Sequence, residues 1–453
     1  LDLRNQKVKD NIVFRSRVIA YLREKMTEMG FLEIQTPILC ASSPEGARDY
    51  IVPSRKYKGK FYALPQAPQQ YKQLLMVSGF DKYFQIAPCF RDEDARADRS
   101  PGEFYQLDFE MSFATQEDVF RTGEEVLSAT FEKFAPEGYA VTKAPYPVIS
   151  YKQAMLEFGT DKPDLRNPLR IIDLTEFFQA CSFKPFHGRT VRAIKVHADM
   201  SKGFHEKLLK FATDMGMGGL GYLEVAEDMS YKGPIDKFIP EDKKSELAEL
   251  AGLAAGDTIF FIADREERAA YYAGQIRTEL GQKLELIEKN AYRFCYINDF
   301  PMFELDSDTK QIGFTHNPFS MPQGGLEALT TMDPLEILAY QYDIVCNGVE
   351  LSSGAVRNHD MDIMVKAFEI AGYDEETLKS KFGALYNAFQ FGAPPHAGMA
   401  PGVDRMIMLL RNEENIREVI AFPMSGSAQD LMCGAPNDVT EQQLREVHIK
   451  IRS

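Results

Sequence analysis

The sequence predicts an α+β protein into which a second, α/β module is inserted. Two long apolar runs, 82–90 and 103–113, flank a charged connection, which is typical of two strands joined in a hairpin. Prolines then cluster between 145 and 168, and beyond them helical and strand-like segments alternate over 170–290. A chain of 453 residues is long enough for about three domains, so we expect domain boundaries near 158 and 290.

Composition and charge exclude several classes of protein. Hydrophobic residues make up 44% and charged residues 26%, as in most globular chains, and no apolar run reaches the length of a membrane span. A net charge of −15 argues against a nonspecific nucleic-acid-binding protein, which needs positive charge. The six cysteines form no Cys-x-x-Cys pair, so we expect reduced thiols and a cytoplasmic protein without zinc or disulfides.

Local periodicity predicts the individual elements in order. Residues 11–29 carry apolar side chains at three- and four-residue spacing, which predicts an amphipathic helix that ends at Gly30. Four further segments are predicted in the same way: strands over 31–39 and from 292 onward, and helices over 66–79 and 333–346.

One glycine pattern imitates a nucleotide-binding motif. Gly216-Met-Gly218-Gly-Leu-Gly221 fits the G-x-G-x-x-G fingerprint, which requires a strand before it and a helix after it. Here a helical pattern precedes the glycines and a strand-like one follows, so we interpret them as a helix end that leads into a strand.

Three segments contain the residues best suited to chemistry, and in this order they resemble the three motifs of class II aminoacyl-tRNA synthetases. They are 30–37, 90–110 and 398–409. Further segments narrow the resemblance to the bacterial-type aspartyl-tRNA synthetase family: 44–49, 64–69, 72–75, 161–166, 299–303 and 349–357. The resemblance covers essentially the whole chain, and many segments in one order are far more specific than any one of them.

The resemblance implies an architecture. It implies an antiparallel sheet of six or seven strands flanked by helices, in a class II catalytic domain made of 1–158 and 291–453. Between these parts lies a bacterial-type insertion domain, 159–290. The family forms homodimers with the first motif at the interface. By resemblance, residue 1 falls just after the position where the family's N-terminal anticodon-binding barrel ends, so we expect no counterpart of that barrel within residues 1–453.

The resemblance also implies a reaction. L-aspartate and ATP, with Mg²⁺, form aspartyl-adenylate, and the aspartyl group then moves to the 3′ end of tRNA(Asp). Whether tRNA(Asn) is also charged stays open. A paralogue that passes activated aspartate to a non-tRNA acceptor is an alternative, because the barrel is missing. A non-catalytic, synthetase-like protein is a weaker alternative, because Arg91, Glu350 and Arg405 are all present.

Five residues match the family's nucleotide site. A carboxylate attacks phosphorus without a general base, so the site must position the reactants and neutralise phosphate charge, for which arginine is well suited. By resemblance, Arg91 holds the α-phosphate and the aspartate carboxyl group, and Arg405 lies against the adenine and near the γ-phosphate; these two are the catalytic residues that the resemblance implies. Phe104 stacks on the other face of the adenine, Glu93 reaches the nucleotide and Arg99 contacts the outer phosphates.

Two carboxylates match the family's metal ligands. Asp343 and Glu350 are seven residues apart, so they would share one face if the helix predicted over 333–346 continued. Carboxylates, phosphate oxygens and water are what Mg²⁺ prefers. By resemblance, Glu350 also belongs to the ATP site.

The pocket for an acidic side chain should contain cations. Lys72, in an otherwise apolar helical run, and Arg357, after a glycine-containing segment, are the candidates. Asparagine would leave both cations poorly paired, so we expect aspartate to be preferred over asparagine by about 10⁴-fold. The resemblance adds five aspartate-binding residues: Glu45, Gln69, Gln106, Asp108 and His316. His316 is followed by Asn317, where many relatives have a second histidine.

Overall fold

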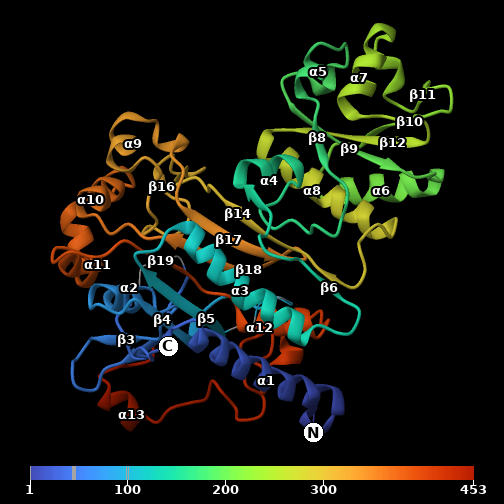
Figure 1. Cartoon of the computed structure of the whole chain (residues 1–453). Coiled ribbons are helices and arrows are strands. Elements are labelled where there is room, and N and C mark those ends of the chain that lie inside the picture. The colour runs from blue at the N-terminus through green and yellow to red at the C-terminus, as the bar shows by residue number, and fades with distance from the viewer. Residues whose placement is uncertain (1, 43–46, 98, 100–101, 453) are drawn as a thin grey trace. The chain divides into compact units, whose positions relative to one another are not determined.

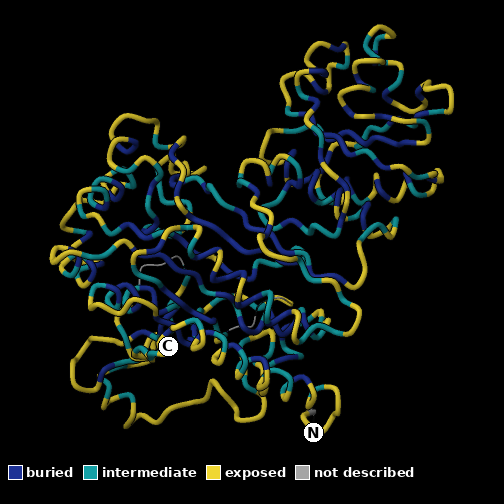
Figure 2. The backbone as a smooth tube through the Cα atoms, in the orientation of Figure 1, coloured by how far each residue is buried: buried dark blue, intermediate teal, exposed yellow. Residues whose placement is uncertain are grey.

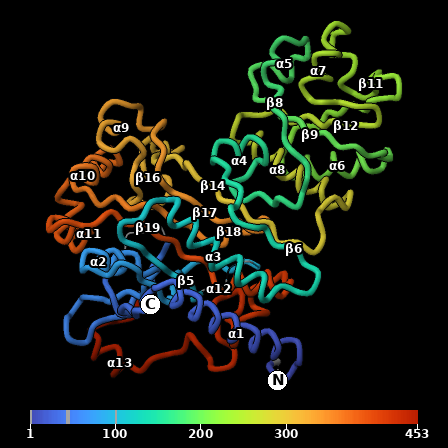
Figure 3. Tube along the Cα trace, viewed as in Figure 1, coloured from blue at the N-terminus to red at the C-terminus, as the bar shows by residue number. Residues whose placement is uncertain are grey.

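The computed structural model describes residues 2–42, 47–97, 99 and 102–452, and it divides into two compact units. Unit 1 comprises Leu1–Tyr146, Asp299–Ile344 and Glu350–Ser453, and unit 2 comprises Pro147–Asn298 and Val345–Val349. Unit 2 is largely the green-to-yellow part of the trace in Figure 3. The segment 159–290 lies inside unit 2, and its boundaries as a domain stay a prediction.

Unit 1 is built on a sheet that positions most of the candidate site residues (Figure 1). The strands that unit 1 contributes to this sheet are, in spatial order, β1 (Leu32–Glu33), β4 (Lys82–Arg91), β5 (Gly102–Ser112), β19 (His396–Met399), β18 (Val349–Val356) and β17 (Gln341–Cys346). The pairs β4–β5, β5–β19 and β19–β18 are antiparallel, and β1 runs parallel to β4. An α+β fold with a sheet flanked by helices is therefore confirmed, and the parallel strand β1 makes the sheet mixed.

Helices and short hairpins complete unit 1. The helices are α1 (Gln6–Glu28), α2 (Gln69–Val77), α3 (Gln116–Phe134), α9 (Gly325–Thr331), α10 (Met361–Ile370), α11 (Glu375–Phe389), α12 (Val403–Leu410) and α13 (Glu441–Glu446). The short strands are β2 (Ile51–Pro53), β3 (Phe61–Ala63), β6 (Ala140–Val141), β15 (Phe303–Leu305) and β16 (Ile312–Phe314). α3 packs on the sheet, where the rings of Phe120 and Tyr342 meet edge to face at 5.1 Å.

The first helix is longer than its apolar spacing predicts. α1 begins at Gln6 because the side chain of Asn5 accepts a hydrogen bond from the backbone N–H of Lys7 and caps the helix. It ends where predicted, since Gly30 has a φ of +84°, the left-handed conformation that glycine adopts without strain.

Unit 2 contains an antiparallel sheet of five strands: β11 (Tyr231–Lys232), β10 (Gly221–Val225), β12 (Asp257–Asp264), β9 (Thr190–His197) and β8 (Ile171–Asp173). Its helices are α4 (Tyr151–Glu157), α5 (Thr175–Gln179), α6 (Lys202–Asp214), α7 (Lys244–Ala251) and α8 (Glu266–Lys283). Its other strands are β7 (Val148–Ser150), β13 (Ala291–Tyr292) and β14 (Phe294–Asn298). α6 precedes the glycines 216–221 and β10 follows them, so the order expected of a helix end is confirmed.

The helix predicted over 333–346 is wrong. A single 3-10 turn, Pro334–Glu336, is followed by the strand β17, all six residues of which are buried. A strand buried on both faces has no polar alternation, so its apolar run was mistaken for helical spacing. Asn347 and Gly348, both at positive φ, then join β17 to β18 as a two-residue turn.

Burial follows the sheets. Figure 2 shows the central strands buried, whereas most of the chain beyond residue 421 is exposed. Among the described residues, no helix is both long enough and apolar enough to cross a membrane.

Candidate active site

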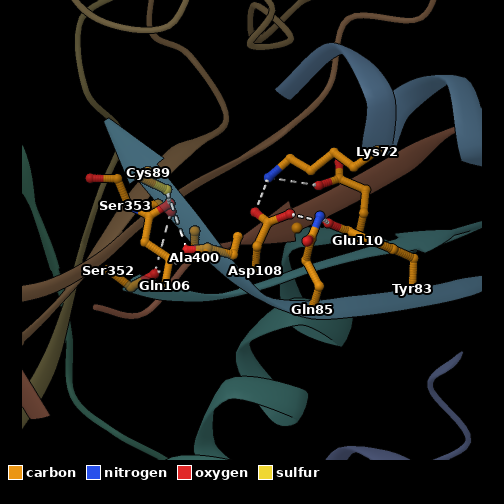
Figure 4. Close-up of polar contacts among 12 residues, drawn as sticks. Lys72, Tyr83, Gln85, Cys89, Gln106, Asp108, Glu110, Ser352, Ser353 and Ala400 are labelled. Atoms are coloured by element: carbon orange, nitrogen blue, oxygen red, sulfur yellow. Dashed lines mark hydrogen bonds and ion pairs between the residues drawn. The ribbon is translucent and has the colours of Figure 1, made fainter. Parts of the chain in front are cut away.

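A buried ionic cluster lies where α2 meets β5. Asp108 and Glu110 are two residues apart on β5, so their side chains emerge on the same face of the sheet, and both are fully buried. Lys72 of α2 reaches both carboxylates: its Nζ lies 2.6 Å from Oδ1 of Asp108 and 3.5 Å from Oε2 of Glu110 (Figure 4). Lys72 itself is only 2% exposed, so this helix presents a cation to the interior and not to solvent.

Arg357 joins the same cluster from the end of β18. Its Nε and Nη2 donate to Oε1 and Oε2 of Glu110 at 2.8 and 3.2 Å, which is the bidentate arginine–carboxylate geometry. Glu110 therefore lies between the two predicted cations, Lys72 and Arg357. Burial opposes ionisation of Glu110, but the charges of Arg357 and then Lys72 outweigh it, and the pKa of Glu110 is lowered.

Glu110 is the functional candidate that the sequence reasoning missed. It lies within the segment 90–110 that resembles the second motif. Of the polar residues at the end of that segment, only Gln106 and Asp108 are predicted to bind aspartate. Polar residues at 106, 108 and 110 alternate with the apolar Leu107 and Phe109, and this two-residue period was the available signal. A carboxylate placed at such a position is buried with its neighbours and needs a cation.

Both carboxylate oxygens of Asp108 accept hydrogen bonds within the protein. Its Oδ2 accepts a hydrogen bond of 2.9 Å from the hydroxyl of Tyr83, and Gln85 donates to that hydroxyl at 2.6 Å. Burial and the neighbouring Asp108 raise the pKa of Tyr83, so its hydroxyl remains a donor. Both oxygens of Asp108 are thus engaged, and its clearest contact is with Lys72.

Two predicted glutamines flank the cluster. Gln69 lies one turn before Lys72 on α2, is 6% exposed, and its Nε2 has no hydrogen-bond partner among the described residues. Gln106 lies on β5 opposite Ala87, and its Oε1 accepts a hydrogen bond of 3.4 Å from the thiol of Cys89. Burial raises the pKa of that thiol to about 12, so it stays protonated and donates.

In the β4–β5 hairpin, Arg91 lies beside an aromatic ring. Arg91 pairs with Gly102 at the end of the hairpin where the connection begins, and Cys89 pairs with Phe104 two residues along. The guanidinium of Arg91 lies 4.9 Å from the centre of the Phe104 ring. In the connection, Arg99 and Glu93 form an ion pair of 2.7 Å, so these two predicted residues are brought together as well.

A cavity of about 710 Å³ opens beside this hairpin. Arg91 and Glu93 line it from the hairpin, and His316 lines it from the segment after β16. The exposed His316 packs edge to face against Phe300, with ring centres 5.2 Å apart. A nucleotide-sized ligand fits a cavity of this volume.

Arg405 lies at the start of α12, close to β5. Its neighbour Asp404 accepts a hydrogen bond of 2.8 Å from the backbone N–H of Tyr105, which fixes α12 against the strand that carries Phe104. The Nη1 of Arg405 donates to the backbone oxygen of Glu350 at 2.7 Å. Arg405 is not among the described residues that line the cavity beside Arg91, so a common cavity for both guanidinium groups stays a prediction.

The two predicted metal ligands lie on a β-hairpin, which corrects the helical placement. Asp343 is on β17 and Glu350 is on β18, which are neighbours in the sheet. Because a two-residue turn joins these strands, we expect their pairing to place both side chains on one face. A shared face therefore stays a prediction, now on a hairpin in place of the predicted helix.

Two carboxylates suit Mg²⁺ as ligands from the protein. The described residues contain no group of three or more His, Cys, Asp or Glu side chains that could hold a metal by themselves. Mg²⁺ commonly takes one or two carboxylates and completes its coordination with phosphate oxygens and water, so the donor set fits. Glu45, the remaining predicted residue, lies outside the described residues.

Comparison with known proteins identifies the class. The family model for class II tRNA synthetases (D, K and N) matches residues 1–426. An aspartate–tRNA(Asp/Asn) ligase of Ehrlichia canis is 58% identical over the whole chain, which covers 77% of that protein. A ligase of the same name from Gluconobacter oxydans is 57% identical, with 76% of it covered, and an aspartate–tRNA ligase of Streptomyces avermitilis is 56% identical, with 77% covered. The chain therefore belongs to the class II tRNA synthetases of the D, K and N group.

Proposed function

We propose that this enzyme is an aspartate–tRNA ligase, which activates L-aspartate with ATP and transfers it to tRNA. The observation that carries the proposal is the meeting of Lys72 and Arg357 at one buried carboxylate, Glu110. Relatives named for this activity, 56–58% identical over the whole chain, support it.

Lys72 and Arg357 account for the choice of an acidic substrate. A guanidinium carries five N–H donors and can bind one carboxylate at each of two edges, and an ammonium carries three. Glu110 accepts hydrogen bonds from Nε and Nη2 of Arg357, and Lys72 forms ion pairs with Asp108 and Glu110. Both cations are therefore held in place before the substrate binds. We propose that the aspartate carboxylate binds as an additional acceptor between them, and that Gln69, Gln106, Asp108, Glu45 and His316 complete the aspartate site.

Arg91 is the residue that we assign to the first step. The carboxylate of aspartate is already a nucleophile, so the protein has to align it with the α-phosphorus and stabilise the charge of the phosphates. We propose that Arg91 does both, and that adenine stacks between Phe104 and Arg405 while Glu93 and Arg99 contact the nucleotide. Asp343 and Glu350 would hold Mg²⁺, which neutralises phosphate charge when it is bound.

An exchange assay tests the proposal. The enzyme should exchange labelled pyrophosphate into ATP when L-aspartate is present, and far more slowly with L-asparagine. Aminoacylation of tRNA(Asp) and tRNA(Asn) transcripts then measures which acceptors are used. Absence of aspartate-dependent exchange would overturn the proposal, and exchange without transfer to either tRNA would favour the alternative with a non-tRNA acceptor.

Two further expectations belong to the same proposal. Leu32 in the first-motif segment is 53% exposed, and Ile38 and Leu39 directly after that segment are 39% and 53% exposed; a homodimer that covers them would remove these apolar side chains from water. Equilibrium sedimentation of the wild type and of a Leu39→Asp variant tests this. We expect the reaction to take place in the cytoplasm, where its thiols stay reduced; all six cysteines are free here.

A further inference from the structure

A buried histidine lies beside the ionic cluster and has no assigned role. His396 is the first residue of β19 and is completely buried. Its Nδ1 lies 2.8 Å from the backbone oxygen of Pro394, and its Nε2 lies 3.3 Å from Nε2 of Gln73, which is also completely buried. A carbonyl oxygen only accepts, so Nδ1 must carry the hydrogen. In the neutral ring Nε2 is then an acceptor, and Gln73 donates to it.

The imidazole remains neutral among charged neighbours. Burial lowers the pKa of His396 to about 4, although the nearby carboxylate of Glu110 favours the protonated form; Arg357 and His359 disfavour it. A neutral ring matters here because the cluster already contains two cations and two carboxylates. A third cation beside Glu110 would compete for the carboxylate that holds Arg357 in place.

His396 is hydrogen-bonded to both segments that carry the cations of the proposed aspartate pocket, Lys72 and Arg357. Its side chain is hydrogen-bonded to Gln73, the residue next to Lys72 on α2. Through its backbone oxygen it accepts a hydrogen bond of 2.9 Å from the backbone N–H of Arg357. We propose that His396 and Gln73 are positioning residues for aspartate selection, which hold Lys72 and Arg357 at the spacing that the substrate carboxylate requires.

This inference rests on the proposed function, and a variant of Gln73 tests it. Gln73→Met keeps the length and volume of the side chain and leaves Nε2 of His396 without its donor. We expect the KM for aspartate in pyrophosphate exchange to rise about tenfold, the KM for ATP to change less than about twofold, and the preference for aspartate over asparagine to fall. Ser78→Ala is the control, because it removes a hydrogen bond from the exposed end of the same helix, to the Leu74 oxygen.

A pair of His396 variants separates positioning from general stability. The Oε1 of glutamine can replace Nε2 as the acceptor for Gln73, whereas the Nδ2 of asparagine can replace only Nδ1 as the donor to Pro394. His396→Gln should therefore keep the KM for aspartate within about threefold of wild type, and His396→Asn should raise it about tenfold. Thermal unfolding of both variants shows whether they are comparably folded.

The outcomes are distinguishable. Selective effects on aspartate for Gln73→Met and His396→Asn, with rescue by His396→Gln, support the inference. An unchanged KM for aspartate in folded Gln73→Met, or equal changes in KM for aspartate and ATP, would overturn it. The wild type is assayed before any variant. If it shows no aspartate-dependent exchange, the proposed function fails.

Discussion

Gly398 faces Glu110 across the β5–β19 pairing, and it leaves the space that the Glu110 carboxylate occupies. A β-carbon built at position 398 would lie 2.2 Å from Oε2 of Glu110 and 2.2 Å from the backbone oxygen of Phe109. Real β-carbons do not approach so closely, and the backbone oxygen cannot move aside as a flexible side chain would. The buried ionic cluster therefore depends on a residue that has no side chain.

Gly398→Ala should destabilise the protein and disrupt the cluster. We expect a loss of about 3 kcal/mol in the free energy of unfolding, because either β19 or Glu110 must shift in a packed interior. Gly383→Ala is the control: Gly383 lies within α11, and a β-carbon added there would meet none of the described residues within 4 Å, so its unfolding free energy should stay within about 1 kcal/mol of wild type. Equal stability of the two variants in urea titrations would contradict this account of Gly398.

Lys72→Ala should weaken aspartate binding far more than ATP binding. The substitution removes a cation of the proposed pocket and leaves Asp108 without its ion-pair partner, so we expect the KM for aspartate to rise about 10²-fold. Lys366→Ala is the control, since Lys366 lies on α10 and forms an exposed ion pair with Glu369. Steady-state exchange kinetics provide both constants, and an unchanged KM for aspartate would refute the pocket assignment.

Arg91→Ala should impair chemistry more than folding. Loss of one charge-stabilising donor costs about 10²–10³-fold in rate, and we expect that fall in adenylate formation measured by rapid quench. Arg121→Ala removes an arginine that is mostly exposed, in an ion pair with Asp118 within one turn of α3, and should leave the rate unchanged. A rate for Arg91→Ala within a few-fold of wild type would remove Arg91 from the proposed mechanism.

The metal assignment predicts a shift in magnesium dependence. Glu350→Gln keeps the shape of the side chain and removes its charge, so the Mg²⁺ concentration for half-maximal exchange should rise about tenfold. Glu369→Gln changes an exposed carboxylate on α10 and serves as the control. Identical Mg²⁺ titrations of the two variants would exclude Glu350 as a metal ligand.

His396 should make stability depend on pH. Its folded-state pKa of about 4 lies below its ordinary value of 6.5, so between these values the unfolded chain binds the proton and the folded protein does not. The stabilisation is complete above about pH 6.5 and is lost as the pH falls through about 4, which amounts to about 3 kcal/mol. Denaturant titrations from pH 7 to 4 should show a shallower fall for His396→Gln than for wild type, and parallel curves would contradict the assignment.

The sequence predicted local structure well where the pattern was local. The hairpin of β4 and β5 follows from two apolar runs on either side of a charged connection, and the end of α1 follows from one glycine, Gly30. The segment of β17 was misread, because all six of its residues are buried and its apolar run carries no strand period. Asn347-Gly348 was the missed signal, since this dipeptide is typical of a tight hairpin turn.

The candidate site was predicted by resemblance more than by spacing. Lys72, Glu110 and Arg357 are far apart in the sequence, and the pairings of β19 with β5 and β18, together with the position of α2, bring them together. No periodicity encodes such a contact. Glu110 was therefore overlooked, although it is the group through which the two cations meet.

The turn that joins β17 to β18 restricts how this segment can change. A shared face for Asp343 and Glu350 depends on the two-residue separation of the strands, since each further residue along a strand reverses the direction of its side chain. We expect one inserted residue to turn Glu350 away from Asp343 without altering either carboxylate. The hairpin should therefore tolerate substitution within the turn better than a change of its length by a single residue.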